Sequence, residues 1–571
     1  MIDKNHRAML KMLLRGFQGL LREERRQGDA LGTLFRTLRR GIPTYKQDRT
    51  VGQELYLRAQ RHPHKIFIDF RGERWTYKEL DDKSGRLAYQ MRELLPKGGS
   101  VGIMAGNHPE YLEVFFATQK AALTSVPINR SLKSDGLAYI LNNAEVDLIF
   151  VDPDLYPAVQ AIWKEVPKLR WIVGFERRGE LLKGVESYDS FLSSGSHSIR
   201  EGAKPDPETA SLIIYTSGTT GLPKGVSYRY GETSQIKLMR FFAHANLDER
   251  DVYYTCFPLF HANALIVTVI GALYASARVV LAERFSASQF WNELRAYGVT
   301  TVNTFTSMIP ILMKQSPTPL DRIHKVEKIF DSGMPKEYWG PFQNRFGVRV
   351  IESYGAVDGG GILLFNMGDA PAGSLGKPLP GTKYKLVDDE GKEVGVGVHG
   401  ELVHRLRKGD FRFEYHKNAE ASQQKVRAHW VHSGDLLMRD SEGYLYFVGR
   451  KNDAIRRRGE NISALEVESA ILKHPDVLDC AAFGVPAELG EEEVMVVVVP
   501  VDGKTIDPEQ VNRFLEDHLQ GYAIPRYVEV VSELPKTETH KVIKSILKSR
   551  GVGRNTWDRE KHPARENARE D

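Results

Sequence analysis

The stretch from Tyr215 to Val226 carries the densest set of groups in this chain that could bind phosphate. It follows the apolar run Leu212 to Ile214, which predicts a strand that leads into a loop. Glycines let backbone N–H groups approach a polyphosphate, hydroxyl groups add neutral donors, and a lysine adds a mobile ammonium. The residues that this pattern assigns to the phosphate are Thr216, Ser217, Gly218, Thr219, Thr220, Gly221 and Lys224. The stretch therefore predicts a site for a nucleoside triphosphate.

Two other interpretations of this stretch are weaker. The P-loop pattern requires Gly before its Lys and Ser or Thr after it, at the start of a helix. Here Pro223 precedes Lys224 and Gly225 follows it. An ordinary surface loop rich in Gly, Ser and Thr is the second alternative. The buried strand before the loop and a second predicted strand after it, Val226 to Tyr230, count against that alternative.

Short apolar runs alternate with helical patterns on both sides of the loop. This alternation predicts parallel strands with covering helices. Helices are expected to begin at Thr76 and at Pro109, because a threonine and a proline at these places suit a helix start. The predicted strands cover residues 66–68, 101–104, 125–127, 147–151 and 171–173 before the loop, and residues 253–257, 278–281, 300–303, 328–331 and 349–352 after it. The sequence therefore predicts an α/β fold.

The pattern changes twice in the C-terminal part of the chain. After Gly373 the predicted segments are shorter and β-like, with a hairpin-turn composition at Val387 to Val394. From about Asp453 a helix at Ala464 to Leu472 is followed by two strand candidates, which indicates a small separate α+β unit. The tail from Arg550 to Asp571 is polar and charged, so we expect it to be disordered.

Composition narrows the class of protein. A chain of 571 residues is long enough for about three units of ordinary domain size. Its two cysteines, Cys256 and Cys480, lie in apolar strand-like runs, which disfavours a disulfide framework and favours a reducing compartment. We find no signal-peptide pattern and no uninterrupted apolar run of about 18 residues. The net charge of +5 is too small for this length to indicate a nucleic-acid partner.

The positive charge is concentrated in an N-terminal arm, residues 1–50. This arm holds 12 Lys and Arg but only 5 Asp and Glu. Leucines and one phenylalanine recur at helical spacing between Leu10 and Leu21, with most basic residues off that stripe. A basic amphipathic helix within residues 7–40 would lie on anionic lipid, or it would pack on the body of the protein and leave its basic face in water. The sequence leaves both alternatives open.

Further short motifs follow the phosphate-binding stretch in a fixed order. They are Phe260-His261, Tyr354-Gly355, Gly434-Asp435, Gly449-Arg450 and, near the end, Lys541. Together with Tyr215 to Val226 they resemble the adenylate-forming superfamily of acyl-CoA synthetases, luciferases and peptide-synthetase adenylation domains. The resemblance covers roughly Val51 to Lys548, which is nearly the whole chain.

The resemblance implies a domain plan and a set of co-substrates. A large N-terminal domain of stacked mixed sheets with covering helices and a β subdomain would span residues 51–451. A small mobile C-terminal α+β lid would span residues 452–549, followed by the tail at residues 550–571. The chain would use ATP, Mg²⁺ and CoA together with a small-molecule carboxylic acid.

The resemblance also implies which residues bind the nucleoside. Tyr354, followed by Gly355, corresponds to the aromatic residue that stacks on adenine, and Ser332 and Gly333 belong to the same nucleotide site. Asp435 corresponds to the acid that accepts hydrogen bonds from both ribose hydroxyls, which suits a carboxylate. Arg450 would make the other contact to the ribose.

A magnesium-coordinating acid is implied at Asp358. The family pattern at this place is Tyr-Gly-x-Thr-Glu, whereas this chain has Val357 in place of Thr and Asp358 in place of Glu. The substitutions remove a hydroxyl group and shorten the acid by one methylene. We therefore expect altered metal geometry and a raised magnesium requirement.

Several lid residues are assigned by the resemblance as well. Lys541 corresponds to the lysine that reaches the acyl carboxylate and the α-phosphate, where its charge stabilises the transition state. Asn452 corresponds to the hinge, and Gly459 to the turn that lines the pantetheine path. Arg456, with the two arginines after it, would meet a phosphate of CoA or only water. These four positions predict a lid that serves both half-reactions.

His261 resembles the aromatic gate that moves to admit a thiol beside the acyl site. A histidine in an apolar run could equally be an ordinary core residue, and the sequence does not decide between the two. The acyl pocket is expected along Phe305 to Leu312, at Met334 and along Gly359 to Leu364, all mostly apolar. No buried acid or cation is evident there, so an apolar carboxylic acid is the expected substrate.

The chain looks most like the branch of crotonobetaine/carnitine-CoA ligases and fatty-acid-transport proteins, from Arg458 to Ser463 and from Pro258 to Met313. The resulting expectation is an AMP-forming ligase that makes an acyl-CoA, most simply from a fatty acid. The alternatives are a carnitine-type CoA ligase and a fatty-acid uptake protein with weakened chemistry. We expect it in the cytoplasm, with peripheral membrane contact through the N-terminal arm as the open question.

Overall fold

The structure is a computed structural model of the whole chain, and it describes most residues from Arg49 to Lys561. The described ranges are 49–176, 185–195, 197–216, 222–231, 247–304, 308–359, 361–366, 370–378, 382–405, 413–457, 460–487, 492–537 and 542–561. The N-terminal arm expected to carry a basic helix lies outside these ranges, apart from its last two residues.

The first unit is a seven-stranded sheet in the order β7-β6-β5-β3-β4-β8-β9. All neighbours pair in parallel except β8 and β9, which form an antiparallel hairpin. The strands are β3 Ser100–Met104, β4 Thr124–Pro127, β5 Val146–Val151, β6 Trp171–Gly174, β7 Glu186–Ser187, β8 Ala210–Thr216 and β9 Lys224–Arg229. The helices are α3 Val51–Arg61, α4 Tyr77–Leu94, α5 Pro109–Ala121, α6 Ser134–Asn143, α7 Tyr156–Ala161 and α8 Tyr188–Ser193, with a short 3₁₀ turn at Trp163–Glu165.

Local signals explain where these helices begin. Thr76 caps α4 in a capping box with Glu79, and α5 starts at Pro109 with the His108 side chain accepting from the Tyr111 N–H. Both predicted helix starts are confirmed, and so is the parallel arrangement of the predicted strands. Helix α5 is buried along nearly its whole length, and its charged residues Glu113 and Lys120 are buried with oppositely charged partners.

The second unit is a nine-stranded sheet in the order β16-β15-β14-β13-β12-β10-β11-β1-β2. The strands are β1 Ile66–Phe70, β2 Glu73–Thr76, β10 Val252–Thr255, β11 Arg278–Leu281, β12 Thr301–Asn303, β13 Lys328–Asp331, β14 Arg349–Ala356, β15 Gly361–Asn366 and β16 Lys377–Pro378. The helices are the π-helix η2 Asn263–Ile270, α10 Gly271–Ala275, α11 Phe290–Ala296, α12 Met308–Lys314 and α13 Lys336–Phe346, with a 3₁₀ turn at Pro319–Arg322. The early hairpin β1–β2 pairs with β11 of this sheet. Because the hairpin lies between α3 and α4 in the chain, it connects the second sheet to the helices of the first unit.

A five-stranded antiparallel β subdomain follows. It contains β17 Lys383–Val387, β18 His399–Arg405, β19 Val426–Arg427, β20 Trp430–Arg439 and β21 Leu445–Arg450, and one helix, α14 Ala419–Lys425. The turn predicted at Val387 to Val394 is present, because Val387 and Glu393 form a bridge across it.

The C-terminal part forms a hairpin and a four-stranded sheet of its own. The strands are β22 Ala454–Arg457, β23 Glu460–Ser463, β24 Val477–Pro486, β25 Glu492–Pro500, β26 Tyr527–Val530 and β27 Trp557–Asp558, and the helices are α15 Ala464–Ile471, α16 Pro508–Glu516 and α17 Lys544–Arg550. The expectation of a disordered tail is wrong for the described residues up to Lys561. Strand β27 pairs with β26, and Arg526 forms ion pairs with Asp558 and Glu560.

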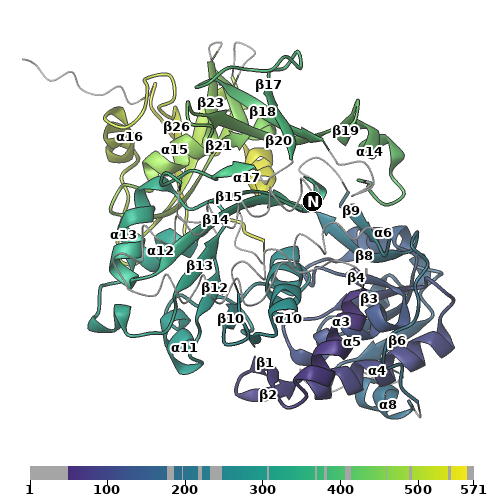
Figure 1. Cartoon of the computed structure of the whole chain (residues 1–571). Helices are drawn as coiled ribbons and strands as arrows, with labels where there is room; N and C mark the ends of the chain where they lie inside the picture. Colours follow the sequence, from purple (N-terminus) through teal and green to yellow (C-terminus); the bar gives the residue numbers. More distant parts are fainter. Residues whose placement is uncertain are drawn as a thin grey trace, which may run out of the picture.

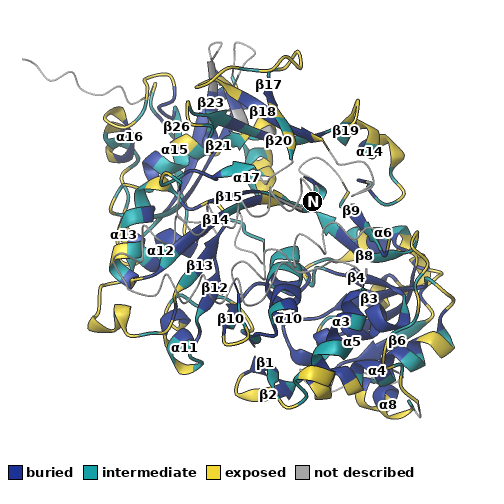
Figure 2. Ribbon diagram, in the orientation of Figure 1, coloured by how far each residue is buried: buried dark blue, intermediate teal, exposed yellow. Residues whose placement is uncertain are grey.

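Figure 1 shows the seven-stranded sheet at the lower right, the nine-stranded sheet to its left and the β subdomain above them. Tyr228 of β9 donates to the carbonyl of Val357, and Tyr354 of β14 donates to Asp435 of β20. Buried residues are concentrated in the strands, while the outer faces of helices such as α8 and α16 are exposed (Figure 2). No helix in the described parts of the chain is long and apolar enough to cross a membrane.

Candidate nucleotide and acyl site

The phosphate-binding stretch is carried on the β8–β9 hairpin. Thr216 and Lys224 are cross-strand partners at the loop end of this hairpin, and the Thr216 hydroxyl donates to the Lys224 carbonyl at 3.3 Å. Ser217 to Gly221 lie outside the described residues. A strand follows Lys224 and not a helix, which confirms that the stretch is not a P-loop.

The residues assigned to the ribose are brought together by sheet register. Asp435 of β20 and Arg450 of β21 are direct cross-strand partners, and Arg450 Nε lies 3.6 Å from Asp435 Oδ1. The Tyr354 hydroxyl donates to Asp435 Oδ2 at 2.5 Å. Asp435 is 8% exposed, and this burial raises its pKa in spite of Arg450. Three residues far apart in the sequence therefore form one contact group.

Tyr354 is buried in β14 and faces Phe447 of β21, with the ring centroids 6.5 Å apart. Gly355 stands at an irregularity of the β14–β15 ladder, because the register shifts between Tyr354 and Gly355. Such a bulge re-aims the side chains beside it, and glycine is common there. The Tyr-Gly pair thus has a geometric role in setting the direction of the tyrosine ring.

Asp358 lies in the short turn η4, Val357–Gly359, directly after β14. Its Oδ2 accepts from the Tyr415 hydroxyl at 2.8 Å and from the Lys425 ammonium at 3.0 Å. Burial acts to raise the pKa of Asp358, but the charge and hydrogen bond of Lys425 and the Tyr415 hydroxyl outweigh it and lower the pKa. Asp358 is therefore an ionised carboxylate that already has a counter-charge.

Asp358 can serve a magnesium ion only as a single-oxygen ligand. Within the described residues its contacts go to Oδ2, which leaves Oδ1 for a metal, and no cluster of three or more His, Cys, Asp or Glu is present there. Magnesium is usually held by one or two carboxylates together with phosphate oxygens and water. One remaining carboxylate oxygen fits that requirement, so Asp358 stays the predicted metal residue.

The loop with Ser332 and Gly333 is held by a carboxylate that the sequence interpretation missed. Glu352 of β14 accepts from the backbone N–H of Gly333 at 2.5 Å and of Met334 at 3.1 Å. Gly333 has a φ of +105°, which a residue with a Cβ rarely adopts. The bonds to Glu352 fix this loop beside the strand that carries Tyr354.

Asp331 is the parallel neighbour of Glu352 in β13, and both carboxyl groups are buried, at 0% and 2% exposure. The Thr304 hydroxyl lies 2.7 Å from Asp331 Oδ2. Burial raises the pKa of Asp331 to about 7 and that of Glu352 well above its ordinary range. The expectation that no buried acid lies near Met334 is therefore wrong. The signal that could have found the pair is a charged residue at the end of each of two apolar strands.

His261 lies between β10 and the π-helix η2, and its ring stacks at an angle on Phe260 with the centroids 4.4 Å apart. Its carbonyl accepts from the Leu265 N–H, so it stands at the entrance of the helix. π-Helical turns often occur at functional sites. This geometry fits both a gate and a packed core residue, so the role of His261 as a gate stays a prediction.

The expected acyl pocket is partly described. Met308, Ile309, Leu312 and Met334 are buried apolar side chains. Residues 305–307, Gly360 and the side chain of Ile362 lie outside the description. A polar network not foreseen from the sequence borders η2. In it the Asn303 amide donates to Asn263 at 2.7 Å and to Thr268 at 2.6 Å.

The lid residues are only partly placed. Asn452 lies in the 3₁₀ turn η5, Lys451–Asp453, between β21 and β22, while Gly459 and Lys541 lie outside the described residues. Arg456 is exposed on β22. Arg457 beside it is 1% exposed, with its Nε 2.7 Å from Glu493 and its guanidinium donating to the carbonyls of Tyr522 and Ile524. Of these two arginines only Arg456 is placed to meet a ligand, because Arg457 is part of the lid core.

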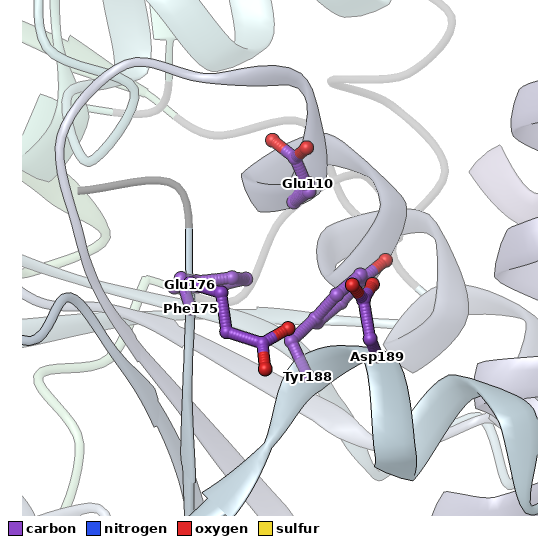
Figure 3. A pocket seen from close by; sticks show the side chains of 5 residues that line it. All are labelled: Glu110, Phe175, Glu176, Tyr188 and Asp189. Atoms are coloured by element: carbon purple, nitrogen blue, oxygen red, sulfur yellow. The ribbon is translucent and has the colours of Figure 1, made fainter. Parts of the chain in front are cut away.

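A separate cavity of about 350 Å³ lies in the N-terminal part (Figure 3). Glu110, Glu176 and Asp189 surround it together with Phe175 and Tyr188. These residues come from α5, from the end of β6 and from α8. None of those elements carries a residue assigned to the nucleotide, so this cavity is distinct from the candidate site.

Comparison with known proteins identifies the family. The model of the AMP-binding enzyme family matches residues 55–408, and the model of its C-terminal domain matches residues 466–541. The crotonobetaine/carnitine-CoA ligase of Escherichia coli (strain ATCC 8739) is 30% identical over 487 residues, which are 83% of this chain and 93% of that protein. The corresponding ligase of Shigella flexneri has the same identity and coverage.

Solved structures agree with this fold. An anthranilate CoA ligase, AuaEII, in complex with anthranoyl-AMP has a TM-score of 0.80 at 24% identity, covering 89% of this chain and 98% of its own. ATP-bound MatB from Rhodopseudomonas palustris has a TM-score of 0.76 at 25% identity, covering 87% and 98%. A large α/β N-terminal domain and a small C-terminal domain are common to this fold.

The chain belongs to the AMP-binding enzyme family. It is an adenylate-forming acid–CoA ligase of that family, with ATP, Mg²⁺ and CoA as its cofactor and co-substrates. The expectations for fold class, enzyme class and cofactors are thereby confirmed.

The buried carboxyl pair gives a testable dependence of stability on pH. The folded pKa of Asp331 lies above the unfolded value, so the fold holds a proton that the unfolded chain releases. Stability should therefore fall as pH rises from about 4 toward about 7. Asp331→Asn imitates the protonated side chain, and we expect its Tm to exceed that of the wild type by more at pH 8 than at pH 5.

Thermal unfolding followed by intrinsic fluorescence at both pH values measures this difference, which should correspond to about 1–3 kcal/mol. Asp321→Asn is the matched control, because the hydrogen bonds of Arg345 and Thr318 overcome burial and lower the pKa of Asp321. Its Tm should fall below that of the wild type at pH 8. A Tm difference for Asp331→Asn that is the same at both pH values would show that the carboxyl is not protonated in the fold.

Proposed function

We propose that this ligase activates an apolar carboxylic acid, most simply a fatty acid. The acid would attack the α-phosphorus of ATP to form acyl-AMP and release pyrophosphate. The thiol of CoA would then attack the acyl carbonyl, and AMP would leave. The observation that carries the proposal is the contact group of Tyr354, Asp435 and Arg450 beside the β8–β9 hairpin, with buried apolar side chains from α12 and Met334 nearby.

In this proposal each described residue has one task. Tyr354 faces adenine, with the Ser332–Gly333 loop held opposite by Glu352. Asp435 and Arg450 bind the ribose, and Asp435 can accept from the ribose hydroxyls as well as from Tyr354, because a carboxylate has about four acceptor positions. Lys224 and Thr216 lie at the entrance of the phosphate loop. Asp358 offers one oxygen to Mg²⁺, which neutralises phosphate charge when it is bound.

A carnitine-type substrate is the second candidate. The 30% identical relatives are crotonobetaine/carnitine-CoA ligases. The buried carboxyl groups of Asp331 and Glu352 lie beside Met334, and such groups attract a cationic substrate where they are ionised. We favour the apolar acid because Glu352 already accepts two backbone N–H groups and burial favours the neutral form of Asp331.

We further propose that the N-terminal domain spans residues 51–451 and the lid residues 452–549, with Asn452 as the hinge. The turn η5 lies between the β subdomain and the first lid hairpin, which supports this boundary. In the lid, Gly459 and the exposed Arg456 would line the path of CoA. His261 would act as the gate beside the acyl group.

A panel of acids tests the substrate class. Purified protein is mixed with ATP, MgCl₂ and fatty acids of several chain lengths, benzoate, carnitine or crotonobetaine, and pyrophosphate release is measured. Thioester is then scored after addition of CoA. We expect release with apolar acids and much less with the cationic acids, and Asp435→Ala as the control should release none.

The opposite preference would favour the carnitine-type ligase. Release of no pyrophosphate with any acid would contradict the proposed function. It would favour a binding or uptake protein with weakened chemistry.

Lys541 is proposed as the residue that stabilises charge during adenylate formation. Lys541→Ala should abolish acyl-AMP formation but leave preformed acyl-AMP competent for thioester formation, because the lid turns this lysine away in the second step. Single-turnover assays of each half-reaction measure the two effects. Lys536→Ala is the matched control, since Lys536 is bound to Asp479 within the lid and should be dispensable for both steps. Equal loss of both half-reactions in Lys541→Ala would contradict this role.

Peripheral membrane contact through residues 7–40 is a further part of the proposal, with the protein in the cytoplasm. Deleting residues 1–40 should reduce co-sedimentation with anionic vesicles and leave turnover of a water-soluble acid unchanged, because the basic residues of the arm would face the lipid. High salt should weaken binding of the full chain, and neutral vesicles are the control. Unchanged vesicle binding after the deletion would instead show that the arm is structural.

A further inference from the structure

We propose that Lys425 is a built-in counter-cation for Asp358, and that it lowers the dependence of nucleotide binding on the divalent metal. The inference rests on the proposed function, because it takes Asp358 as the carboxylate that faces the metal and the phosphates. Lys425 acts through Asp358, and it is therefore a positioning residue.

Lys425 is fixed between two oxygen atoms. It is the last residue of α14, and its Nζ lies 3.0 Å from Asp358 Oδ2 and 3.2 Å from the carbonyl oxygen of Ser433. Its side chain is only 13% exposed, so the charge pair is screened less than a pair on the surface. Ser433 in turn accepts from the Asp435 N–H through its hydroxyl at 3.0 Å. Lys425 thus connects the carboxylate of Asp358 to the segment that carries the ribose acid.

The turn with Asp358 is also fixed from the side of the phosphate loop. Tyr228 of β9 donates to the Val357 carbonyl at 3.1 Å, and Tyr415 donates to the same Asp358 oxygen that Lys425 contacts. The ring of Tyr415 lies next to Lys224, whose Nζ is 5.3 Å from the ring centroid. The Asp358 carboxylate is therefore held near the loop that would carry the polyphosphate.

A carboxylate in this position creates an electrostatic problem. An ionised Asp358 repels a polyphosphate unless a cation compensates it. A divalent metal supplies that cation in a metal–nucleotide complex, but Lys425 supplies one positive charge to Asp358 before any metal arrives. Metal-free nucleotide should then bind with less repulsion, and the gain from adding metal should be smaller.

The magnitude follows from the effect of a neighbouring charge on a carboxylate. An opposite charge within about 4–6 Å lowers the pKa of a carboxyl group by about 1–3, which changes its protonation equilibrium by about 10- to 1000-fold. Asp358 and Lys425 are partly exposed, at 27% and 13%, so we expect the lower end of that range. Removing the charge of Lys425 should change the metal dependence by about 10-fold.

The test compares nucleotide affinity with and without metal. α,β-Methylene-ATP, which cannot form an adenylate, is titrated into the protein by calorimetry at pH 8, once in excess EDTA and once in excess MgCl₂. The ratio of the two Kd values is the metal dependence. Lys425→Met should raise this ratio by about 10-fold, mainly by weakening the binding of metal-free nucleotide.

Two matched variants separate charge from packing. Lys425→Arg keeps the positive charge and should keep the ratio close to that of the wild type. Tyr415→Phe removes a neutral donor from the same oxygen of Asp358 and should raise the ratio far less than Lys425→Met. A ratio that rises equally in Tyr415→Phe and Lys425→Met would overturn the role of charge.

A double-mutant cycle tests whether Lys425 acts through Asp358. The variant that carries both Asp358→Asn and Lys425→Met lacks both charges of the pair, so its ratio should lie close to that of the wild type. An unchanged ratio in Lys425→Met, or a double variant whose ratio stays as high as that of Lys425→Met, would overturn the proposal. If Lys425→Met does not fold, the affinity of Asp358→Asn for metal-free nucleotide tests the proposal by itself. It leaves Lys425 uncompensated and should tighten the binding of metal-free nucleotide, so weaker binding would overturn the proposal.

These titrations contain no carboxylic acid, so their outcome is independent of the substrate. Failure of the proposed substrate class would appear as missing pyrophosphate release with every acid, while the Kd ratios would still be measurable. Failure of the counter-cation would appear in the ratios alone, with an active wild-type enzyme.

Discussion

Four carboxylates lie in a site that must accept a polyanion, and each of them is matched by its own partner. Asp331 is paired with the Thr304 hydroxyl, and its raised pKa favours the neutral form. Glu352 accepts two backbone N–H groups, Asp435 accepts from Tyr354 beside Arg450, and Asp358 is paired with Lys425 and Tyr415. Burying an unmatched charge is costly, so these partners allow the site to exist without its ligand.

The partners also join the elements of the site into one network. Asp331 and Glu352 are neighbours on adjacent strands, and Tyr354 follows Glu352 on the same strand. Tyr354 contacts Asp435, Ser433 next to Asp435 contacts Lys425, and Lys425 contacts Asp358. The network crosses from the nine-stranded sheet to the β subdomain, so the position of one ligand-binding residue depends on the packing of the others.

Much of the fold and part of the site could be predicted from the sequence. The helix starts at Thr76 and Pro109 and the parallel strands depend on local patterns of apolar spacing and on capping residues. Tyr354, Asp435 and Arg450 were found because they stand in short motifs of fixed composition. Glu352, Lys425 and Tyr415 were missed because no local pattern distinguishes them, and the polar tail up to Lys561 was misjudged for the same reason.

The sequence by itself determined the class of the protein, because a phosphate-binding loop and the nucleoside motifs are local features whose chemistry depends on residue type and spacing. Only the tertiary structure decided how those residues are charged and held. Asp435 lies beside Arg450 through strand register, and Asp358 lies beside Lys425 across 67 positions of chain through the packing of α14 against the β subdomain. A carboxylate's pKa and its readiness for a metal depend on burial and on neighbouring charges. Those neighbours come from distant segments, so the properties of the site are fixed only when the sheets have assembled.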